Sequence, residues 1–275
     1  MPPRLRADEM DDQSWEKSMA DFKFIEYGVD GGLVTIALNR PPYNVLDIAT
    51  MEELNHALDL AAKEEGAKVV MITGRGEKTF SAGVDVLDHT PDKVVQMIEV
   101  FHGILKRLMV FPLPTVAALN GSAMGGGCEL AVACDMVVAT EDTKLGQPEI
   151  KLGVFPPIAA ILMPKILPLP KAMELLLGGG LIGAKEALAL GLLNKVFARA
   201  TFAADTQEFL KQFLSLSRVA LIYTKRAIRE AAGKPFFEAL FNVEQIYLKE
   251  LMATADAVEG LNSFMEKRKP VWTNK

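Results

Sequence analysis

Three consecutive glycines mark one place in the sequence where chemistry could occur. Gly125, Gly126 and Gly127 end a loop after the predicted strand 115–119, and a run compatible with a helix, 128–134, follows directly. A helix N-terminus presents unpaired backbone N–H groups, and the missing side chains let a ligand oxygen approach. Glycine clusters also form tight turns, so a purely conformational role stays open at this point.

A second turn of small residues lies upstream. The segment Phe80-Ser81-Ala82-Gly83-Val84-Asp85 follows a predicted strand at 68–73. Two such turns after two successive strands could direct two N–H groups at one point. Those donors would stabilise the oxyanion that forms when a carbonyl gains negative charge, a contribution of about 3–4 kcal/mol per donor in well-studied enzymes.

Two carboxylates near these turns suit general acid–base chemistry. Glu129 lies in the first turn of the predicted helix, where the helix dipole stabilises the ionised form. Glu149 precedes the almost uncharged stretch 152–164, where burial would raise its pKa. One carboxylate that favours the anion beside one that favours the neutral acid is what a proton-transferring site needs. Simple stabilisation of the helix N-terminus is the alternative for Glu129.

Several familiar motifs are incomplete in this chain. Gly178–Lys185 has phosphate-loop spacing but lacks the Lys-Ser/Thr pair. Gly121–Gly125 resembles a nucleophile elbow, but its serine is one place early and no histidine follows it. No metal site and no disulfide framework are expected from the spacing of the three histidines and two cysteines, which are His56, His89, His102, Cys128 and Cys134.

The elements that would position these residues alternate between strands and helices. Alternating apolar residues at 22–29 and 33–38 flank Asp30-Gly31-Gly32, which predicts a β-hairpin. Helices are predicted over 48–62, over 94–109 and after the glycines, with strands at 68–73, 115–119 and 136–139. Short buried strands separated by helices predict a layered α/β fold.

Beyond residue 200 the pattern is helical only. Helices are predicted over 202–216, 218–232 and 235–264. The chain is thus expected to comprise a frayed polar leader (1–21), an α/β core (22–200) and a helical C-terminal region (201–275). Intramolecular packing and subunit contact explain equally well the wide apolar stripe of the last helix, which consists of Phe237, Leu240, Phe241, Val243, Ile246, Tyr247 and Leu251.

Composition and charge exclude several classes of function. The 275 residues are 50% hydrophobic and carry 30 Lys and Arg against 35 Asp and Glu, for a net charge of −5. This composition is too apolar for a disordered chain, and too acidic for nucleic acid or an anionic membrane to be the main partner. No apolar run approaches the roughly 20 residues of a membrane span, and the first 20 residues do not resemble a targeting peptide, so a cytoplasmic location is expected.

Four motifs stand in a recognisable order along the chain. They are NRPPYNVL at 39–46, FSAGVD at 80–85, NGSAMGGGCEL at 120–130 and GQPEI at 146–150. Together they resemble the enoyl-CoA hydratase/isomerase (crotonase) superfamily, with similarity over about residues 22–270. The resemblance implies a crotonase-like spiral of ββα units, a helical C-terminal region that joins subunits into homotrimers or dimers of trimers, and an acyl-CoA thioester substrate.

Roles for individual residues come with this resemblance. It implies that the N–H groups of Ala82 and Gly126 hold the thioester oxygen while an enolate forms; coenzyme A belongs to the substrate, and no separate cofactor is expected. The residues implied to line the substrate site are Ser81, Gly83, Val84, Asp85, Gly125, Phe155 and Pro156. Candidates for holding the nucleotide phosphates, with a solvated charge run as the alternative, are Lys267, Arg268 and Lys269.

The two carboxylates narrow the reaction. Family hydratases carry one glutamate in each of the segments that contain Glu129 and Glu149, whereas the isomerases and thioester hydrolases often lack one or move it. The resemblance therefore implies hydration of an α,β-unsaturated acyl-CoA, in which Glu129 deprotonates water and Glu149 supplies the α-proton. Isomerisation, thioester hydrolysis, and a non-catalytic CoA-ester sensor or RNA-associated scaffold stay open as alternatives.

One segment departs from the family pattern. Hydratases usually carry Ile-Pro-Gly-x-Gly-Gly-Thr after the second glutamate, whereas this chain has GVFPPIAA at 153–160. Two prolines and no glycine after Gly153 make this wall stiffer and more apolar. The segment is similar to that of the branch that hydrates cyclohexa-1,5-diene-1-carbonyl-CoA, so a flat cyclic dienoyl-CoA is the expected substrate.

Overall fold

Two β-sheets form the frame of the molecule, for which a computed structural model describes residues 16–17 and 22–275. The larger sheet has seven strands in the order β1-β2-β3-β4-β6-β8-β11, and the smaller has four in the order β10-β9-β7-β5. The larger sheet comprises β1 (Glu16–Lys17), β2 (Ile25–Asp30), β3 (Leu33–Leu38), β4 (Val69–Gly74), β6 (Thr115–Leu119), β8 (Met136–Thr140) and β11 (Lys195–Phe197). The smaller comprises β5 (Thr79–Ser81), β7 (Ser122–Met124), β9 (Lys144–Gly146) and β10 (Leu181–Gly183). The leader predicted at 1–21 falls outside the described residues apart from 16–17.

The hairpin predicted near the start of the chain is confirmed. Strands β2 and β3 pair antiparallel, with Asp30 opposite Leu33. The turn needs glycine because Gly31 and Gly32 have φ angles of 53° and 87°. From β3 to β11 the neighbouring strands are parallel, and β6 is buried along its whole length, as expected for a parallel sheet covered on both faces.

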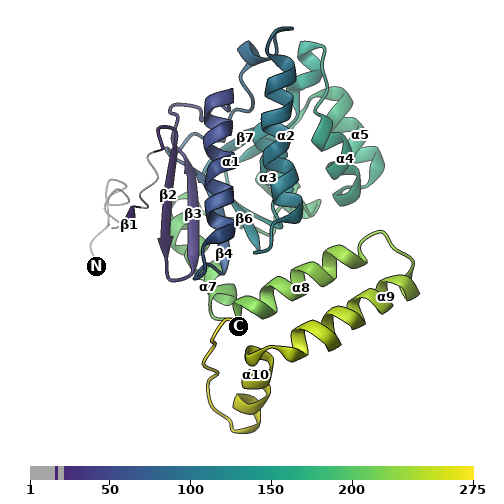
Figure 1. Cartoon of the computed structure of the whole chain (residues 1–275). Helices are drawn as coiled ribbons and strands as arrows, with labels where there is room; N and C mark the ends of the chain where they lie inside the picture. Colours follow the sequence, from purple (N-terminus) through teal and green to yellow (C-terminus); the bar gives the residue numbers. More distant parts are fainter. Residues whose placement is uncertain (1–15, 18–21) are drawn as a thin grey trace.

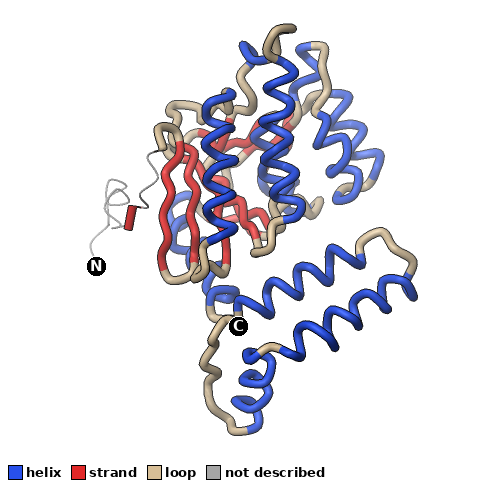
Figure 2. The backbone as a smooth tube through the Cα atoms, viewed as in Figure 1, coloured by secondary structure: helices blue, strands red, loops and turns tan. Residues whose placement is uncertain are grey.

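Helices cover both faces of this sheet (Figures 1 and 2). One face packs on a large core to which α1 and α2 contribute, and the other packs on Leu210, Phe209 and Phe213 of α7. The helices of the α/β part are α1 (Ile48–Lys63), α2 (Val94–Val110), α3 (Gly126–Ala133), α4 (Pro157–Ile166), α5 (Leu169–Gly178) and α6 (Ala184–Ala189). The α/β fold predicted from the alternating pattern is therefore confirmed.

The chain repeats one unit three times. Strands β4, β6 and β8 each lead into a short strand of the smaller sheet, which leads into a helix, so the units are β4-β5-α2, β6-β7-α3 and β8-β9-α4. This repeat is the spiral of ββα units that the resemblance implies. Strands β5, β7 and β9 are parallel neighbours, so their carboxyl ends meet at one edge, and the segments that follow them, 82–85, 125–127 and 147–149, meet there too.

The C-terminal region is helical, but its last predicted helix is broken. It comprises α7 (Phe202–Leu214), α8 (Arg218–Ala231), α9 (Phe236–Gln245) and α10 (Ala255–Met265). Thr254 ends the run predicted over 235–264, because its extended backbone (ψ 150°) and its hydroxyl, which accepts from Ala257 N, begin a new helix. Helices α8 and α9 form a hairpin that projects from the α/β body (Figure 1). No helix of the described chain is long and apolar enough to cross a membrane.

The apolar stripe predicted for the last helix runs from α9 into the π-helical turn Ile246–Glu250 and is largely uncovered. Phe237 is 82% exposed and Phe241 is 61% exposed, while Ile246 is only 5% exposed. Intramolecular packing, one of the two explanations for this stripe, therefore accounts for Ile246 but not for the two phenylalanines.

Candidate active site

A buried asparagine shapes the loop that follows β5. Asn44, with a φ of 48°, is 1% exposed. Its side chain accepts a hydrogen bond from Arg40 N and donates to the carbonyl oxygens of Arg75 and Thr79. These bonds hold the segment 43–46 beside β5, which leads into residues 81–85, a segment that we call the 81–85 loop.

One N–H group of this loop is left unpaired by the contacts with segment 43–46. Three N–H groups already donate: Ala82 to Tyr43 O (2.9 Å), Gly83 to Ser81 Oγ (3.1 Å) and Asp85 to Leu46 O (3.1 Å). Leu46 forms a parallel bridge with Val84, in which Leu46 makes both hydrogen bonds and Val84 N–H points to the other side. Val84 N–H has no hydrogen-bond partner among the described residues.

Val84 N–H faces the start of α3. Gly126 is the first residue of α3, so its N–H has no partner within the helix. A methyl group built on Gly126 would lie 3.3 Å from Val84 N and 2.7 Å from Val84 Cγ2, and one built on Gly83 would lie 3.2 Å from Gly126 N. Glycine is required at 83 and 126 because the two loops approach so closely. The geometry therefore brings together the N–H groups of Val84 and Gly126.

This geometry corrects two predictions for the 81–85 loop. Ala82 is wrong as the partner of Gly126, because its N–H is already committed to Tyr43 O. Ser81 is wrong as a substrate contact, because it is 0% exposed and its hydroxyl donates to Asn44 O and accepts from Gly83 N. Ser81 instead stabilises the loop through these two hydrogen bonds.

Glu129 is almost completely buried beside this pair. It is 3% exposed, and its Oε1 accepts from the backbone N–H groups of Ile158 and Ala159, at 2.9 Å and 2.8 Å, at the N-terminus of α4. Burial and, to a lesser extent, the charge of Glu149 raise the pKa of Glu129 to about 7, against the two N–H bonds, which act in the opposite direction. The carboxyl can therefore gain or lose a proton near neutral pH.

Glu149 lies against Gly125, the residue that precedes α3. A methyl group on Gly125 would lie 2.6 Å from Glu149 Oε1, and Gly125 has a φ of 51°, so no larger residue fits there. Burial raises the pKa of Glu149 as well. The structure thus gathers Glu129, Glu149, Gly125 and Gly126 around the end of β7. The expected contrast between an anionic Glu129 and a neutral Glu149 is not found, because burial outweighs the helix dipole at Glu129 and the pKa values of both carboxyls are raised.

Gln147 is a site residue to which sequence reasoning assigned no role. It is 0% exposed, and its amide nitrogen lies 3.2 Å and 3.3 Å from the two oxygens of Glu149 and 3.2 Å from Gly125 O. The amide is assigned this way because the opposite orientation would turn its oxygen toward acceptors only. The sequence shows only that Gln147 stands two residues before Glu149. This spacing does not indicate that the side chain is buried.

The other predicted substrate contacts are spread around this centre. Asp85 caps the short 3₁₀ turn η2 (Val86–Asp88) by accepting from Leu87 N. Phe155 is 68% exposed, whereas Pro156 is buried at the start of α4. Among the predicted phosphate ligands, Arg268 pairs with Glu259 and Glu266, which favours the alternative of a solvated charge run for this residue.

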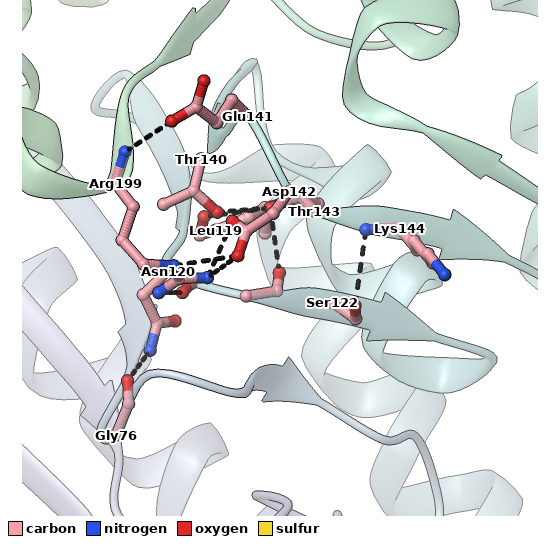
Figure 3. A network of polar contacts seen from close by, with 11 residues as sticks. Gly76, Leu119, Asn120, Ser122, Thr140, Glu141, Asp142, Thr143, Lys144 and Arg199 are labelled. Carbon is pink, nitrogen blue, oxygen red and sulfur yellow. Dashed lines mark hydrogen bonds and ion pairs between the residues drawn. The ribbon is translucent and has the colours of Figure 1, made fainter.

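A polar hollow of about 260 Å³ lies elsewhere, at the amino ends of β5 and β7. Its lining residues are Glu77, Lys78, Gly121, Ser122, Asp142 and Arg199. In the polar network at this corner, Arg199 pairs with Asp142 at 2.7 Å and donates to Asn120 O at 3.1 Å (Figure 3). The network links segments of the two sheets near the amino ends of β5 and β7. Glu129 and Glu149 lie beyond the carboxyl ends of β7 and β9. Nowhere in the described ranges do three His, Cys, Asp or Glu side chains gather to hold a metal ion.

Comparisons with known proteins agree with this architecture. Residues 28–275 match the family "Enoyl-CoA hydratase/isomerase". Cyclohexa-1,5-dienecarbonyl-CoA hydratase of Thauera aromatica is 37% identical over 90% of this chain and 95% of that protein. Carnitinyl-CoA dehydratase of Escherichia coli K12 is 33% identical over 88% and 95%. The crystal structure of an enoyl-CoA hydratase from Bacillus anthracis superimposes with a TM-score of 0.88 and 30% identity over 92% of this chain and 100% of that one. The chain belongs to the enoyl-CoA hydratase/isomerase family.

Proposed function

We propose that this protein is an enoyl-CoA hydratase that adds water across the α,β-double bond of an acyl-CoA thioester. The observation that carries the proposal is the pairing of a buried carboxyl, Glu129, and a half-buried one, Glu149, with two N–H groups, Val84 and Gly126, at one strand edge. The names of the relatives, a hydratase and a dehydratase, support the same reaction class.

The chemistry assigns one task to each group. The N–H groups of Val84 and Gly126 donate to the thioester oxygen and stabilise the negative charge that it gains as the enolate forms. Ionised Glu129 takes a proton from water while the water oxygen bonds to Cβ, and neutral Glu149 gives its proton to Cα. The proton on Glu129 then returns to Glu149, so that the net change is the addition of one water molecule.

A flat cyclic dienoyl-CoA is the substrate that we favour. The wall after Glu149 contains Pro156 and Pro157 in place of flexible glycines, and Phe155 beside them is apolar. A rigid apolar wall suits a rigid ring, because neither partner loses much conformational freedom on binding. The relative from Thauera aromatica, whose printed name specifies such a substrate, supports this choice.

We also propose that the protein assembles as a homotrimer or a dimer of trimers through its C-terminal helices. Phe237 (82% exposed) and Phe241 (61%) on α9 and Phe264 (83%) on α10 are large apolar side chains that face solvent in an isolated subunit, as is typical of residues in a subunit interface. Replacing Phe237 and Phe241 together by glutamate should yield monomers in light scattering coupled to size-exclusion chromatography. A wild-type monomer would contradict the proposed assembly.

The decisive experiment compares substrates and variants. Cyclohexa-1,5-diene-1-carbonyl-CoA and crotonyl-CoA are offered in ¹⁸O-water to the wild type, Glu129→Gln, Glu149→Gln and the exposed control Glu65→Gln. Hydration places ¹⁸O on the carbon chain with the thioester intact, whereas hydrolysis releases coenzyme A and isomerisation incorporates no oxygen. We expect each active-site variant to lose about 100- to 10,000-fold in rate while still binding the ester, and Glu65→Gln to lose nothing. Wild-type rates in both variants would exclude the roles of the two glutamates.

A further inference from the structure

The start of α4 lacks two of the hydrogen-bond donors that a helix N-terminus normally has. The first four N–H groups of a helix have no partner within the helix. In α4 these positions are 156–159, and the first two are Pro156 and Pro157, which have no N–H. The first bond inside the helix runs from Ala160 N to Pro156 O at 3.0 Å. Only the two residues between Pro157 and Ala160 therefore keep a free donor.

Both of these donors bind the same oxygen of Glu129. Ile158 N and Ala159 N donate to its Oε1 at 2.9 Å and 2.8 Å. The described residues give Oε2 no hydrogen-bond donor, and Oε2 is not one of their fully enclosed polar atoms that lack a partner. Oε1 is thus occupied by two donors, whereas Oε2 stays accessible to water.

The two prolines also fix the direction of these donors. Pro156 is buried and has a φ of −82° and a ψ of 105°, the extended conformation that a following proline requires. Pro157 occupies the first position of the helix, where its ring holds φ at about −65°. Because neither ring allows rotation about its N–Cα bond, the turn that leads into α4 is rigid. The carboxyl of Glu129 is therefore held from outside α3, the helix that carries it.

Few charged groups face Glu129 from the elements packed around it. Glu149 raises the pKa of Glu129, and burial raises the pKa of the neighbouring Cys128 thiol to about 12, so the thiol stays neutral. The titratable residue of α4, Lys165, lies in its last turn, and β5, β6, β7 and β8 carry none. α2 contacts the start of α3 through the uncharged ring of Phe101. The two N–H groups of α4 are therefore the main groups that favour the carboxylate of Glu129.

We propose that Pro156 and Pro157 are positioning residues for Glu129, which restrict the start of α4 to two donors that hold Oε1 and leave Oε2 to take the proton from water. The O–H bond of water breaks as the Oε2–H bond forms, and its electron pair becomes the bond from the water oxygen to Cβ. Oε1 remains the carbonyl oxygen of the protonated acid. The inference deepens the proposed hydration, on which its catalytic consequence rests, by assigning the proton transfer to one oxygen of Glu129.

The first test removes each bond to Oε1 separately. Replacing Ile158 or Ala159 by its α-hydroxy acid analogue changes one N–H to an ester oxygen and keeps the side chain. The matched control is the same replacement at Ala160, which removes a backbone bond of the same helix that does not reach Glu129. Circular dichroism checks that all three variants are folded.

The infrared carbonyl band of neutral Glu129, identified by its loss in Glu129→Gln, gives two readouts that need no substrate. At pH 5 we expect this band at higher wavenumber in the Ile158 and Ala159 variants, because Oε1 then accepts one hydrogen bond fewer. We also expect the carboxyl to stay neutral to a pH at least about half a unit higher, because hydrogen bonds to a carboxylate lower its pKa. An unchanged band and midpoint in both variants, or equal shifts in the Ala160 variant, would overturn the inference.

The second test connects the prolines to the reaction. Pro157→Gly releases the rigid turn, and Pro170→Gly, in the first turn of α5, is the matched control. We expect Pro157→Gly to raise the infrared midpoint of Glu129 and to lower kcat of hydration about tenfold with unchanged Kd for the ester, and Pro170→Gly to change neither. If the infrared shifts occur but the wild type hydrates no enoyl-CoA, the positioning of Glu129 stands and the proposed function fails. If hydration occurs but Pro157→Gly behaves like Pro170→Gly, the proposed function stands and the role of the prolines fails.

Discussion

The amide nitrogen of Gln147 lies 3.2 Å and 3.3 Å from the two carboxylate oxygens of Glu149. Both side chains belong to one short segment after β9, and Gln147 is completely buried. Its second amide hydrogen reaches Gly125 O, next to the start of α3. Gln147 thus sets the orientation of Glu149 relative to the helix that carries Glu129 and Gly126.

We expect Gln147→Leu to lower kcat about a hundredfold with little change in affinity for an acyl-CoA ester. A displacement of a reacting group by about 1 Å has this effect on rate, whereas Gln147 itself is too deep to contact the nucleotide. The measurement is kcat by steady-state kinetics together with Kd by calorimetry. Gln212→Leu on the surface helix α7 is the control. A variant that loses affinity but keeps kcat would assign Gln147 to substrate binding instead.

The N–H group of Val84, rather than that of Ala82, should govern oxyanion stabilisation. Replacing either residue by its α-hydroxy acid analogue changes one backbone N–H to an ester oxygen and leaves both side chains intact. At position 84 we expect kcat to fall about 100- to 1,000-fold with unchanged stability. At position 82 the lost bond to Tyr43 O should instead lower the free energy of unfolding by about 1 kcal/mol. The reverse pattern would restore Ala82 as the donor.

The sequence predicts Ala82 as the oxyanion donor, whereas the structure leaves the N–H of Val84 free. Local sequence does not determine which backbone N–H group of a loop is left without a partner. The glycines, the two glutamates and the alternation of strands and helices are visible as residue types and spacings. Which N–H of the 81–85 loop stays free depends on Tyr43 and Leu46, nearly forty residues away. The strands of the smaller sheet have only three residues each, which is too short for a periodicity of two to emerge. The parallel pairing of β5, β7 and β9 nevertheless brings the site together.

The buried carboxyl of Glu129 should make stability depend on pH. Its pKa is raised from 4.5 to about 7 in the folded protein, so the folded state binds more protons than the unfolded state between these values. The free energy of unfolding should therefore fall by up to about 3 kcal/mol as pH rises from 4.5 through 7. Glu129→Gln, whose amide oxygen can still accept from Ile158 N and Ala159 N, should remove this loss.

Urea unfolding at pH 5 and pH 8, at one fixed protein concentration, provides the measurement. The wild type should lose more stability than Glu129→Gln between the two pH values, and the exposed Glu65→Gln should behave like the wild type. Equal losses in wild type and Glu129→Gln would mean that Glu129 titrates at its ordinary pKa.

An ion cluster with a buried lysine at its centre attaches α8 to the α/β body. Asp135 Oδ2 lies 2.6 Å from Lys225 Nζ, and Asp135 Oδ1 lies 2.7 Å from an Arg229 guanidinium nitrogen. Lys225 is 8% exposed and also donates to Leu113 O. Burial alone would raise the pKa of Asp135, but the charges and hydrogen bonds of Lys225 and Arg229 prevail and lower it. The cluster therefore stabilises the fold at neutral pH and loses its effect as pH falls through this lowered pKa.

We expect Asp135→Asn to lower the free energy of unfolding by about 3–5 kcal/mol at pH 7, because it leaves the ammonium of Lys225 buried without a counter-charge. Lys225→Met added to Asp135→Asn should recover part of this loss, since the buried cation is then gone, and a double-mutant cycle measures the coupling. Glu250→Gln, which breaks the exposed pair with Arg226 at 2.6 Å, should cost less than about 1 kcal/mol. Equal costs for the two ion pairs would mean that water reaches Asp135 and that α8 is not anchored by a desolvated charge pair.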